Sequence, residues 1–316
     1  MRLATVKDGS RDGALVAVSE DGSRVARVAG YATLQAALDD WGTAQGALGA
    51  AVQSAGSGEA VSPAAFAAPL PRAWQWLDGS AFPNHGALMQ RAFNHAPIET
   101  DLPLMYQGMS HQFIGPTDDV PLPSVADGID FEGEFGIVTG DVPMGCLAED
   151  ALAHVRLVLL INDWSLRAIA PVEMKTGFGW VQAKPACSVA PFAVTPDELG
   201  EAWRDGRVCL PLTVEVDREW FGHPNGSAME FGFHELIAHA ARSRSLPAGT
   251  IIGSGTVSNP DHDTVGSTCI SERRAIEMIA NGAAQTAFLP FGSRVMMRAG
   301  EGVSPFGVID QRVVAG

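Results

Sequence analysis

The chain has 316 residues, of which 46% are hydrophobic and 18% are charged, so it has the composition of a folded protein with a large core. Asp and Glu number 36 against 21 Lys and Arg, which gives a formal net charge of −15. A field of this sign repels nucleic acid and anionic membrane surfaces, so we expect neither as a partner. The acidity favours solubility over a specific cationic partner.

The cysteines and the N-terminus bear on the compartment. Four cysteines are widely spaced without a CxxC pair, which argues against a zinc site of the usual spacing and is typical of buried thiols in a reducing compartment: Cys146, Cys187, Cys209 and Cys269. The N-terminus has no apolar signal core, and no apolar run reaches the roughly 18 residues of a membrane span. We therefore expect a cytoplasmic protein.

The first part of the chain combines strand and helix patterns. Residues 1 to about 30 alternate apolar and polar residues between turn signals at KDGSRDG and SEDGS, which predicts short antiparallel strands. Residues 33–55 have helical spacing, with Leu34, Ala37 and Leu38 on one face. Residues 56–74 are rich in Gly, Ser, Ala and Pro and are typical of a connection. We place a domain boundary near residue 70, which gives a small N-terminal domain over 1–70 and a larger domain over 71–316.

The larger domain is predicted to contain many strands and few helices. An apolar run over residues 155–161, an alternating segment over 208–222 and two segments within 293–314 all have strand patterns. The segment FGFHELIAHAARSRS predicts a helix that ends near Leu246 and is followed by a turn and a strand.

Two carboxylates stand in DFEGEFGIVTG, a segment that otherwise has the pattern of a strand entering the core. Residues two apart in a strand point to the same side at roughly 6.6 Å spacing, so Glu132 and Glu134 would share a face. Unpaired carboxylates near a core repel each other and are costly to desolvate, and a hard divalent cation relieves both problems. Two ordinary glutamates at a solvated strand end would give the same pattern.

A third acid follows the next apolar run. LVLLINDWSLR ends in polar residues, so a buried strand would deliver Asp163 and Arg167 to a site at its end. Asp163 can complete a set of three carboxylates, and Arg167 can clamp the carboxylate of a substrate. A structural Arg–Asp pair is the alternative explanation.

Four motifs, DFEGEFGIVTG, LLINDWSLR, VQAKPACSVAPF and GTIIGSGTVSN, occur in this order and resemble those of the fumarylacetoacetate hydrolase family. The resemblance covers about residues 75 to 310, and the segment before residue 70 looks like the small N-terminal domain that some members carry. It implies a mixed β-roll catalytic domain and a homodimer. The expected fold is therefore α+β and mostly β, with a small N-terminal domain before the catalytic domain.

The resemblance also implies roles for individual residues. It implies metal ligands at Glu132, Glu134 and Asp163. Lys184 matches the lysine that sits beside the metal and the cleaved bond. The implied substrate-binding residues are Arg167, Thr256 of GSGT and Tyr106 of PLMYQGMS.

The general base is expected to be a histidine. His85 lies three residues after Phe82, where family members have an aromatic residue followed by a histidine, and His111 is the competing choice. Asp78, seven residues before His85, is a weaker candidate for a further metal ligand, because only the long members of the family carry an aspartate at that offset.

Three positions depart from the family pattern. Many members orient the histidine with a glutamate three residues on, where this chain has Leu88. Long members use a distant glutamate, where this chain offers Ile270, with Glu272 two residues beyond. The partner of the histidine is therefore expected to be missing or displaced. Ala170 replaces a glutamine of the long members, which also leaves the substrate open.

Together these features predict a metal-dependent hydrolase that cleaves a C–C bond in a 1,3-diketone acid, with Mg²⁺ (or Mn²⁺ or Ca²⁺) as cofactor. The expected substrate is fumarylacetoacetate, a small oxo acid that would yield fumarate and acetoacetate. An acylpyruvate hydrolase, a 2-oxo-dienoate hydratase and an oxaloacetate decarboxylase are alternatives on the same scaffold, and a missing glutamate partner favours the last two. A structural cation in a non-enzymatic protein is a further alternative, against which the presence of Lys184, Arg167 and Thr256 argues.

Overall fold

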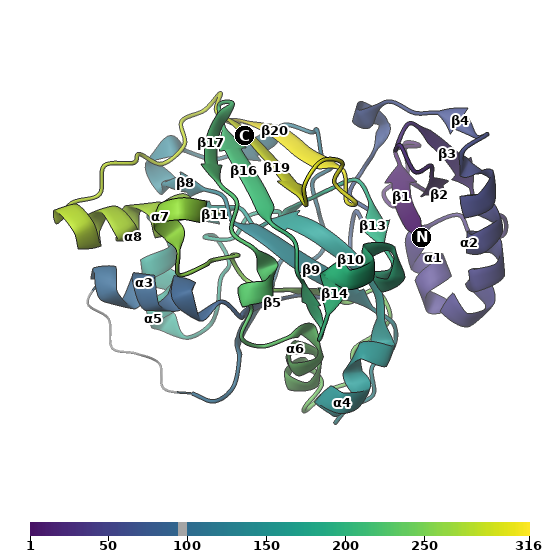
Figure 1. The fold of residues 1–316 in the computed structure, drawn as a ribbon, viewed down its shortest axis with the longest axis horizontal. Coiled ribbons are helices and arrows are strands. Elements are labelled where there is room, and N and C mark those ends of the chain that lie inside the picture. Colours follow the sequence, from purple (N-terminus) through teal and green to yellow (C-terminus); the bar gives the residue numbers. More distant parts are fainter. Residues whose placement is uncertain (94–99) are drawn as a thin grey trace.

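The computed structural model describes residues 1–93 and 100–316, and one long mixed sheet runs from the N-terminal part into the larger body (Figure 1). It has 11 strands, with β12 (Ser188–Val189) paired to β10 beside the main path. The strands of the main path, in spatial order, are β4 (Glu59–Ala60), β3 (Arg24–Arg27), β2 (Ala14–Val18), β1 (Arg2–Val6), β13 (Ala193–Val194), β10 (Val155–Asn162), β9 (Gly133–Thr139), β18 (Ile251–Gly253), β5 (Trp76–Ser80) and β6 (Leu104–Gly108).

Smaller sheets and eight α-helices complete the described part of the chain. A 5-stranded sheet has the order β17 (Glu219–Gly222), β16 (Leu212–Val216), β19 (Arg294–Ala299), β20 (Val308–Ala315) and β7 (Val120–Leu122). Two-stranded ribbons join β8 (Ile129–Asp130) to β11 (Ser165–Leu166) and β14 (Trp203–Arg204) to β15 (Arg207–Val208). The helices are α1 (Leu34–Asp39), α2 (Trp41–Ala55), α3 (Pro83–Phe93), α4 (Ala148–Ala151), α5 (Ala170–Thr176), α6 (Phe233–Ala240), α7 (His262–Val265) and α8 (Ile270–Asn281).

The N-terminal part follows its sequence pattern closely. β1, β2 and β3 pair antiparallel, and the three residues expected on the inner face of the helix are buried, as predicted. The single predicted helix is instead two helices. Asp40 lies between α1 and α2 with φ −129° and ψ 38°, which interrupts the helical backbone. α2 packs over β2 and β3.

The sheet is continuous across the predicted domain boundary. β1 pairs antiparallel with β13, with Arg2 opposite Val194 and Leu3 opposite Ala193. The α+β fold with a small N-terminal domain is confirmed, whereas the boundary near residue 70 stays a prediction.

The centre of the long sheet is buried on both faces. Val158 and Leu160 of β10 pack into one hydrophobic cluster, and Leu157, Leu159 and Ile161 pack into a second one on the other side. Alternate residues of a strand point to opposite faces, so a strand between two cores must be apolar at nearly every position. This explains the unbroken apolar run Leu157–Ile161, which Asn162 and Asp163 follow.

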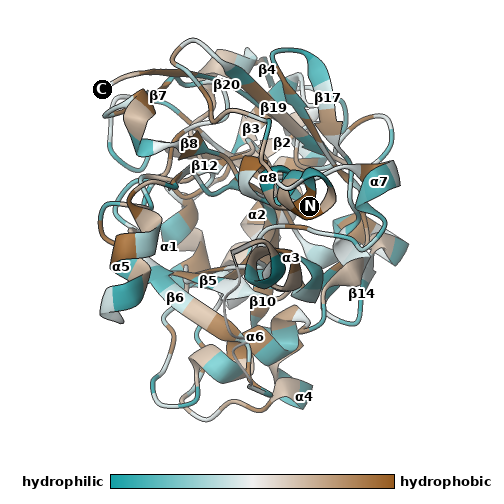
Figure 2. Cartoon of the chain, turned by 90° about the vertical axis from the view of Figure 1, so that its left-hand side faces the viewer, coloured by the Kyte–Doolittle hydropathy of each residue, from teal (hydrophilic) through white to brown (hydrophobic). Residues whose placement is uncertain are grey.

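Among the described residues of the larger domain, five helices were not predicted, namely α3, α4, α5, α7 and α8, and the predicted helix ends early. α3 begins at Pro83 and α8 follows the capping residue Cys269, and the two helices pack against each other (Figure 2). α6 ends at Ala240, before the predicted end near Leu246. Within the described residues, no helix is long and apolar enough to cross a membrane. All four cysteines are free.

Candidate active site

Three buried carboxylates meet where strands of the long sheet lie side by side. β9 and β10 are antiparallel, so Glu134 at the start of β9 lies next to the end of β10, which Asp163 follows directly. β18 lies between β9 and β5 and pairs Gly253 with Asp78. Oxygens of Asp78, Glu134 and Asp163 consequently lie within 4.8 Å of one another, and all three residues are buried. We call these residues the acidic triad.

Gly253 makes room for the acidic triad. A Cβ at this position would lie 2.5 Å from Oδ1 of Asp78 and 2.9 Å from Oε2 of Glu134, distances that no side chain tolerates. The first residue of the GSGT motif therefore has to be glycine for these two carboxylates to approach.

The triad has the properties of a cation site. Neither carboxylate oxygen of Glu134 accepts a hydrogen bond from any described donor, although both are buried. Burial and the neighbouring charge of Asp163 raise the pKa of Asp78 to about 8, and burial and the charge of Asp78 raise the pKa of Glu134 well above its usual range. Without a cation this cluster holds protons, and a divalent metal ion with oxygen ligands fits in their place.

Glu132 is held differently from the triad. Its Oε1 accepts hydrogen bonds from Lys184 Nζ at 2.9 Å and Ser165 Oγ at 2.7 Å, and Thr256 Oγ1 donates to Oε2 at 2.6 Å. Arg167 Nη2 lies 2.7 Å from Oε1. Burial alone would raise the pKa of Glu132, but the charges of the lysine and the arginine lower it well below its usual range. Its predicted role as a metal ligand stays a prediction.

The shared strand face of Glu132 and Glu134 stays a prediction. β9 begins at Gly133, so Glu132 precedes the strand. Asp163 N donates to the carbonyl oxygen of Glu132, and Glu132 N donates to Oδ1 of Asn162. Glu134 belongs to the triad, whereas Glu132 contacts the cationic side chains of Lys184 and Arg167.

Lys184 lies beside the triad, where the family resemblance implied a lysine. Its Nζ donates to Asp163 Oδ2 at 2.6 Å, and Tyr106 donates its hydroxyl to the same oxygen at 2.8 Å. Burial would lower the pKa of Lys184, but the charges of Asp163 and Glu132 raise it above its usual value, so the ammonium stays charged. The other oxygen of Asp163 accepts from the thiol of Cys187 at 3.0 Å, a contact that the sequence did not indicate.

The two further substrate-binding candidates contact acids in this structure. Arg167 Nε donates to Asp130 Oδ2 at 2.8 Å, and Nη2 contacts Glu132. The structural Arg–Asp pair considered above is therefore present, with Asp130 as the acid. Thr256 donates to Glu132. The predicted substrate contacts of Arg167, Thr256 and Tyr106 stay predictions.

His85 on α3 has a carboxylate partner, so of the two alternatives considered, a missing or a displaced partner, the structure shows the displaced one. Its Nδ1 lies 2.9 Å from Oε2 of Glu272, a fully buried residue in the first turn of α8. α3 follows β5, the strand that carries Asp78, and His85 is among the groups that lower the pKa of Glu132, so the pair lies near the acidic cluster, by which we mean the triad together with Glu132. Glu272 lies two residues after Ile270, the position of the glutamate in the long members, and its place in the first turn of α8 brings it to the histidine. His111, the competing choice, is exposed.

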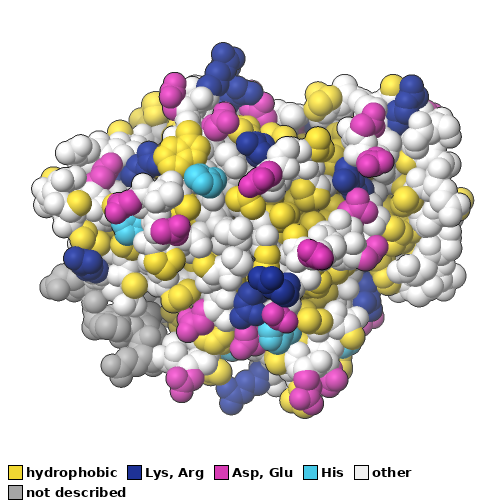
Figure 3. All heavy atoms as spheres, in the orientation of Figure 1, with side chains coloured by type: hydrophobic (Ala, Val, Ile, Leu, Met, Phe, Trp, Pro, Cys, Tyr) yellow, Lys and Arg dark blue, Asp and Glu magenta, His cyan; other side chains and the backbone are white. Residues whose placement is uncertain are grey.

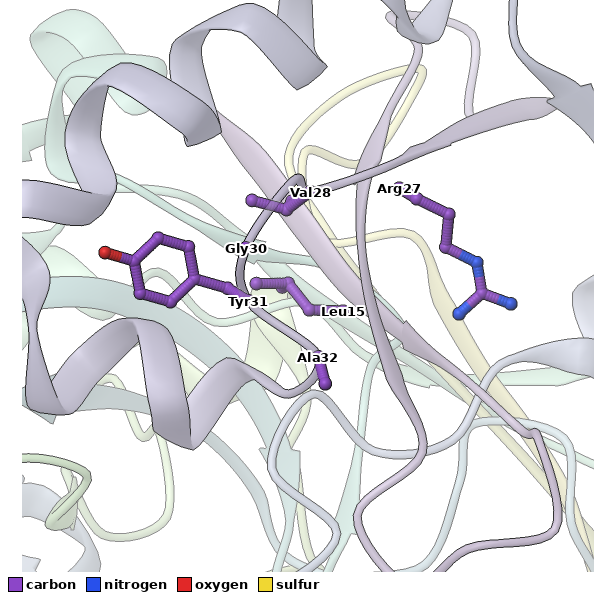
Figure 4. Close-up of a pocket in the computed structure, with 6 residues that line it drawn as sticks. All are labelled: Leu15, Arg27, Val28, Gly30, Tyr31 and Ala32. Atoms are coloured by element: carbon purple, nitrogen blue, oxygen red, sulfur yellow. The ribbon is translucent and has the colours of Figure 1, made fainter.

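Two hollows lie away from this site, and one of them, of about 250 Å³, is lined by His223, Asp261 and Glu301 among other residues. A cavity of about 340 Å³ in the N-terminal part is lined by Leu15, Arg27, Val28, Gly30, Tyr31 and Ala32, with the Arg27 side chain directed away from Tyr31 (Figure 4). It contains no carboxylate or histidine. Acidic side chains are also spread over the molecular surface, in keeping with the net charge (Figure 3).

Curated relatives match about half of the chain, and the chain spans about half of their length. The 2,4-didehydro-3-deoxy-L-rhamnonate hydrolase of Sphingomonas sp. (strain SKA58) is 30% identical over 166 residues, which cover 52% of this chain and 55% of that protein. The human mitochondrial oxaloacetate tautomerase FAHD2B is 27% identical over 157 residues, which cover 49% and 48%.

Solved structures share the fold over the whole chain at low sequence identity. A maleylpyruvate hydrolase from Sphingobium sp. SYK-6, in complex with manganese(II) and pyruvate, superposes with a TM-score of 0.69 at 18% identity and full coverage of both chains. A 5-carboxymethyl-2-hydroxymuconate delta-isomerase from Mycobacterium smegmatis superposes with a TM-score of 0.63 at 18% identity, covering 100% of this chain and 99% of that one.

Family models cover nearly the entire sequence. Residues 1–72 match the fumarylacetoacetase N-terminal domain 2. Residues 75–314 match the fumarylacetoacetate hydrolase C-terminal domain, which contains the acidic triad, Lys184 and the His85–Glu272 pair. This chain belongs to the fumarylacetoacetate hydrolase family.

Proposed function

We propose that this chain is a metal-dependent hydrolase that cleaves a C–C bond in a 1,3-diketo acid, with fumarylacetoacetate as the first substrate to test. The observation that carries the proposal is the His85–Glu272 pair beside a buried triad whose Glu134 oxygens have no hydrogen-bond donor. Hydrolysis needs a group that takes a proton from water, and an imidazole oriented by a carboxylate is suited to this task.

His85, Glu272 and Lys184 would each have a separate role in the reaction. His85 would accept a proton from the attacking water while Glu272 holds the ring in place. Water adds to the carbonyl carbon, and the C–C bond then breaks to give a carboxylic acid and the enolate of the second product. Lys184, which stays charged, would stabilise the developing oxyanion. Return of the proton from His85 to the enolate carbon restores the resting state.

The proposed cofactor is Mg²⁺ or Mn²⁺, with Ca²⁺ as a further choice. Asp78, Glu134 and Asp163 would hold it, because they offer only oxygen ligands in a buried cluster. A divalent cation bound there would polarise the substrate carbonyl and lower the energy of the enolate. The manganese in the maleylpyruvate hydrolase structure supports the choice of a divalent ion.

An acylpyruvate is the second substrate class. The related structure with bound pyruvate is a maleylpyruvate hydrolase, which favours substrates that release pyruvate. Tautomerisation of oxaloacetate, the activity named for the human relative, needs proton transfer but no attacking water. The presence of Glu272 beside His85 removes the argument that a missing partner favours a hydratase or a decarboxylase.

The test follows the enolate ultraviolet band of fumarylacetoacetate with Mg²⁺, with Mn²⁺ and with excess chelator. We expect metal-dependent loss of the band in the wild type and at least a hundredfold slower loss in Glu134→Gln. Asp310→Asn, which changes an acid paired with Arg294 in the smaller sheet, is the matched control. An unchanged band in the wild type, with Mn²⁺ bound, would rule out fumarylacetoacetate and move the screen to acylpyruvates and oxaloacetate.

We also propose a homodimer that acts on a small oxo acid. Light scattering coupled to size-exclusion chromatography measures the mass directly. A mass of 33.2 kDa, that of one chain, would contradict the dimer.

A further inference from the structure

Asp130 is a fully buried acid that none of the steps above uses. Its Oδ1 accepts hydrogen bonds from the backbone N–H groups of Phe131 at 2.8 Å and Ile270 at 2.7 Å. Its Oδ2 accepts from Ser271 N at 2.9 Å and from Arg167 Nε at 2.8 Å. Both oxygens are therefore fully engaged, with partners that come from two different parts of the candidate site.

One set of partners leads to the acidic cluster. Arg167, which donates to Asp130, also contacts Glu132 at 2.7 Å through Nη2. Glu132 in turn accepts from Lys184, and Lys184 donates to Asp163 of the triad. The ribbon of β8 and β11 pairs Asp130 with Ser165, so the backbone holds the acid close to the arginine.

The other set of partners leads to His85. Ile270 and Ser271 are the first two residues of α8, and Glu272 follows them in the same turn. The side chain of Glu272 has few other anchors, because Oε2 contacts His85 and the buried Oε1 has no partner among the described residues. The position of Glu272, and so of His85, thus depends on where the first turn of α8 is held. Asp130 holds it through two backbone N–H groups.

We infer that Asp130 is a positioning residue that couples the acidic cluster to the His85–Glu272 pair. A buried carboxylate needs all of its donors, so a shift of Arg167 on one side is transmitted to the start of α8 on the other. Charge neutralisation at the triad by a cation would fix Lys184, Glu132 and Arg167 and thereby order the first turn of α8. The catalytic part of this inference rests on the proposed function, whereas the coupling itself can be measured without any substrate.

The experiment measures backbone amide exchange of Ile270, Ser271 and Glu272 in the full chain, with and without Mn²⁺. We expect Mn²⁺ to slow exchange of these amides at least tenfold in the wild type. Asp130→Asn replaces one acceptor oxygen with an NH₂ group, so exchange should be faster and the Mn²⁺-dependent slowing should disappear. A merely structural role would speed exchange but leave the metal-dependent difference intact, which would overturn the inference.

Two further variants keep the test decisive if Asp130→Asn folds poorly. Arg167→Gln keeps the hydrogen bonds of Asp130 to the N–H groups of α8 but removes the arginine that connects Asp130 to Glu132. This variant should therefore also abolish the Mn²⁺-dependent slowing. Asp310→Asn, which lies in the smaller sheet, should behave as the wild type. Mn²⁺ binding is followed by calorimetry in each variant. If the wild type binds no Mn²⁺, the proposed function and the coupling fail together; if Mn²⁺ binds and slows exchange equally in the wild type and in Arg167→Gln, the coupling alone is refuted.

Catalysis supplies a second readout once a substrate is turned over. If Asp130 acts through Glu272, the losses in kcat of Asp130→Asn and Glu272→Gln will not add, and the double variant will be about as slow as the slower single variant. Multiplicative losses would show that Asp130 acts independently of Glu272 and would overturn this part of the inference.

Discussion

The clearest quantitative prediction concerns Asp78→Asn in the metal-free protein. Burial and the charge of Asp163 raise the pKa of Asp78 from 3.8 to about 8. The folded chain then binds the proton more tightly than the unfolded chain, so stability is lost as the pH rises from about 4 to about 8. An asparagine does not titrate, and its Oδ1 can still accept the hydrogen bond from Gly255 N, which spans 3.2 Å.

The size of the effect follows from the pKa shift. Each pKa unit corresponds to about 1.4 kcal/mol. The free energy of unfolding of the wild type should therefore fall by on the order of 4 kcal/mol between pH 5 and pH 8, and that of the variant should not show this fall. With an unfolding entropy of about 2 cal/mol/K per residue, a chain of 316 residues would show this as roughly 6 °C in Tm.

The assay is thermal unfolding in excess chelator at pH 5, 6, 7 and 8, with Asp310→Asn as the control. Asp78→Asn should gain in Tm relative to the wild type as the pH rises, and saturating Mn²⁺ should reverse the order because the wild type binds the ion more tightly. A Tm difference that is the same at pH 5 and pH 8 would refute the raised pKa and the electrostatic description of the triad.

Three further predictions concern catalysis and metal affinity. His85→Gln and Glu272→Gln should lower kcat by about 10²- to 10⁴-fold with Mn²⁺ affinity unchanged, and a parallel loss of Mn²⁺ binding in calorimetry would contradict a role in proton transfer. Mn²⁺ affinity of the wild type should rise at least about tenfold per pH unit up to about pH 8, because Asp78 must release its proton; a pH-independent Kd would count against this. Cys187→Ala should weaken Mn²⁺ binding about 10- to 100-fold by freeing Asp163, and Cys187→Ser should restore most of it; equal affinities in the two variants would show that the thiol contact is irrelevant.

The parts of the site that the sequence could predict lie on locally recognisable strands. Glu134 and Asp163 stand at the ends of the two apolar runs that become β9 and β10, and antiparallel pairing of these strands brings the acids together. Asp78 was a weaker candidate because only the long members of the family carry an aspartate at that offset. Its approach to the other two acids depends on the parallel pairing of β5 with β18, strands separated by more than half of the chain. Such pairing leaves no local pattern in the sequence.

The remaining differences between the predicted site and the observed site come from tertiary packing. Period-two spacing predicts one face for Glu132 and Glu134, but it does not show that Glu132 contacts Lys184 and Arg167. Glu272 was read as displaced because its place is set by packing of α8 on α3, which sequence spacing does not contain. A helix-start signal was present, since Cys269 caps α8 and a glutamate follows three residues later.

The long sheet, which contains strands of both the N-terminal part and the larger domain, limits how residues 1–70 can be removed or exchanged. Arg2 and Leu3 pair with Val194 and Ala193 of β13, and β13 pairs in turn with β10, so β13 connects the first strand to the strand that leads toward the acidic cluster. Removing residues 1–70 would uncover an edge of β13 in the middle of the molecule and invite association between chains. Exchange of this segment with that of another family member would succeed only if the register between β1 and β13 were kept. We therefore expect that the N-terminal part does not fold as a detachable module and that the chain melts in one transition.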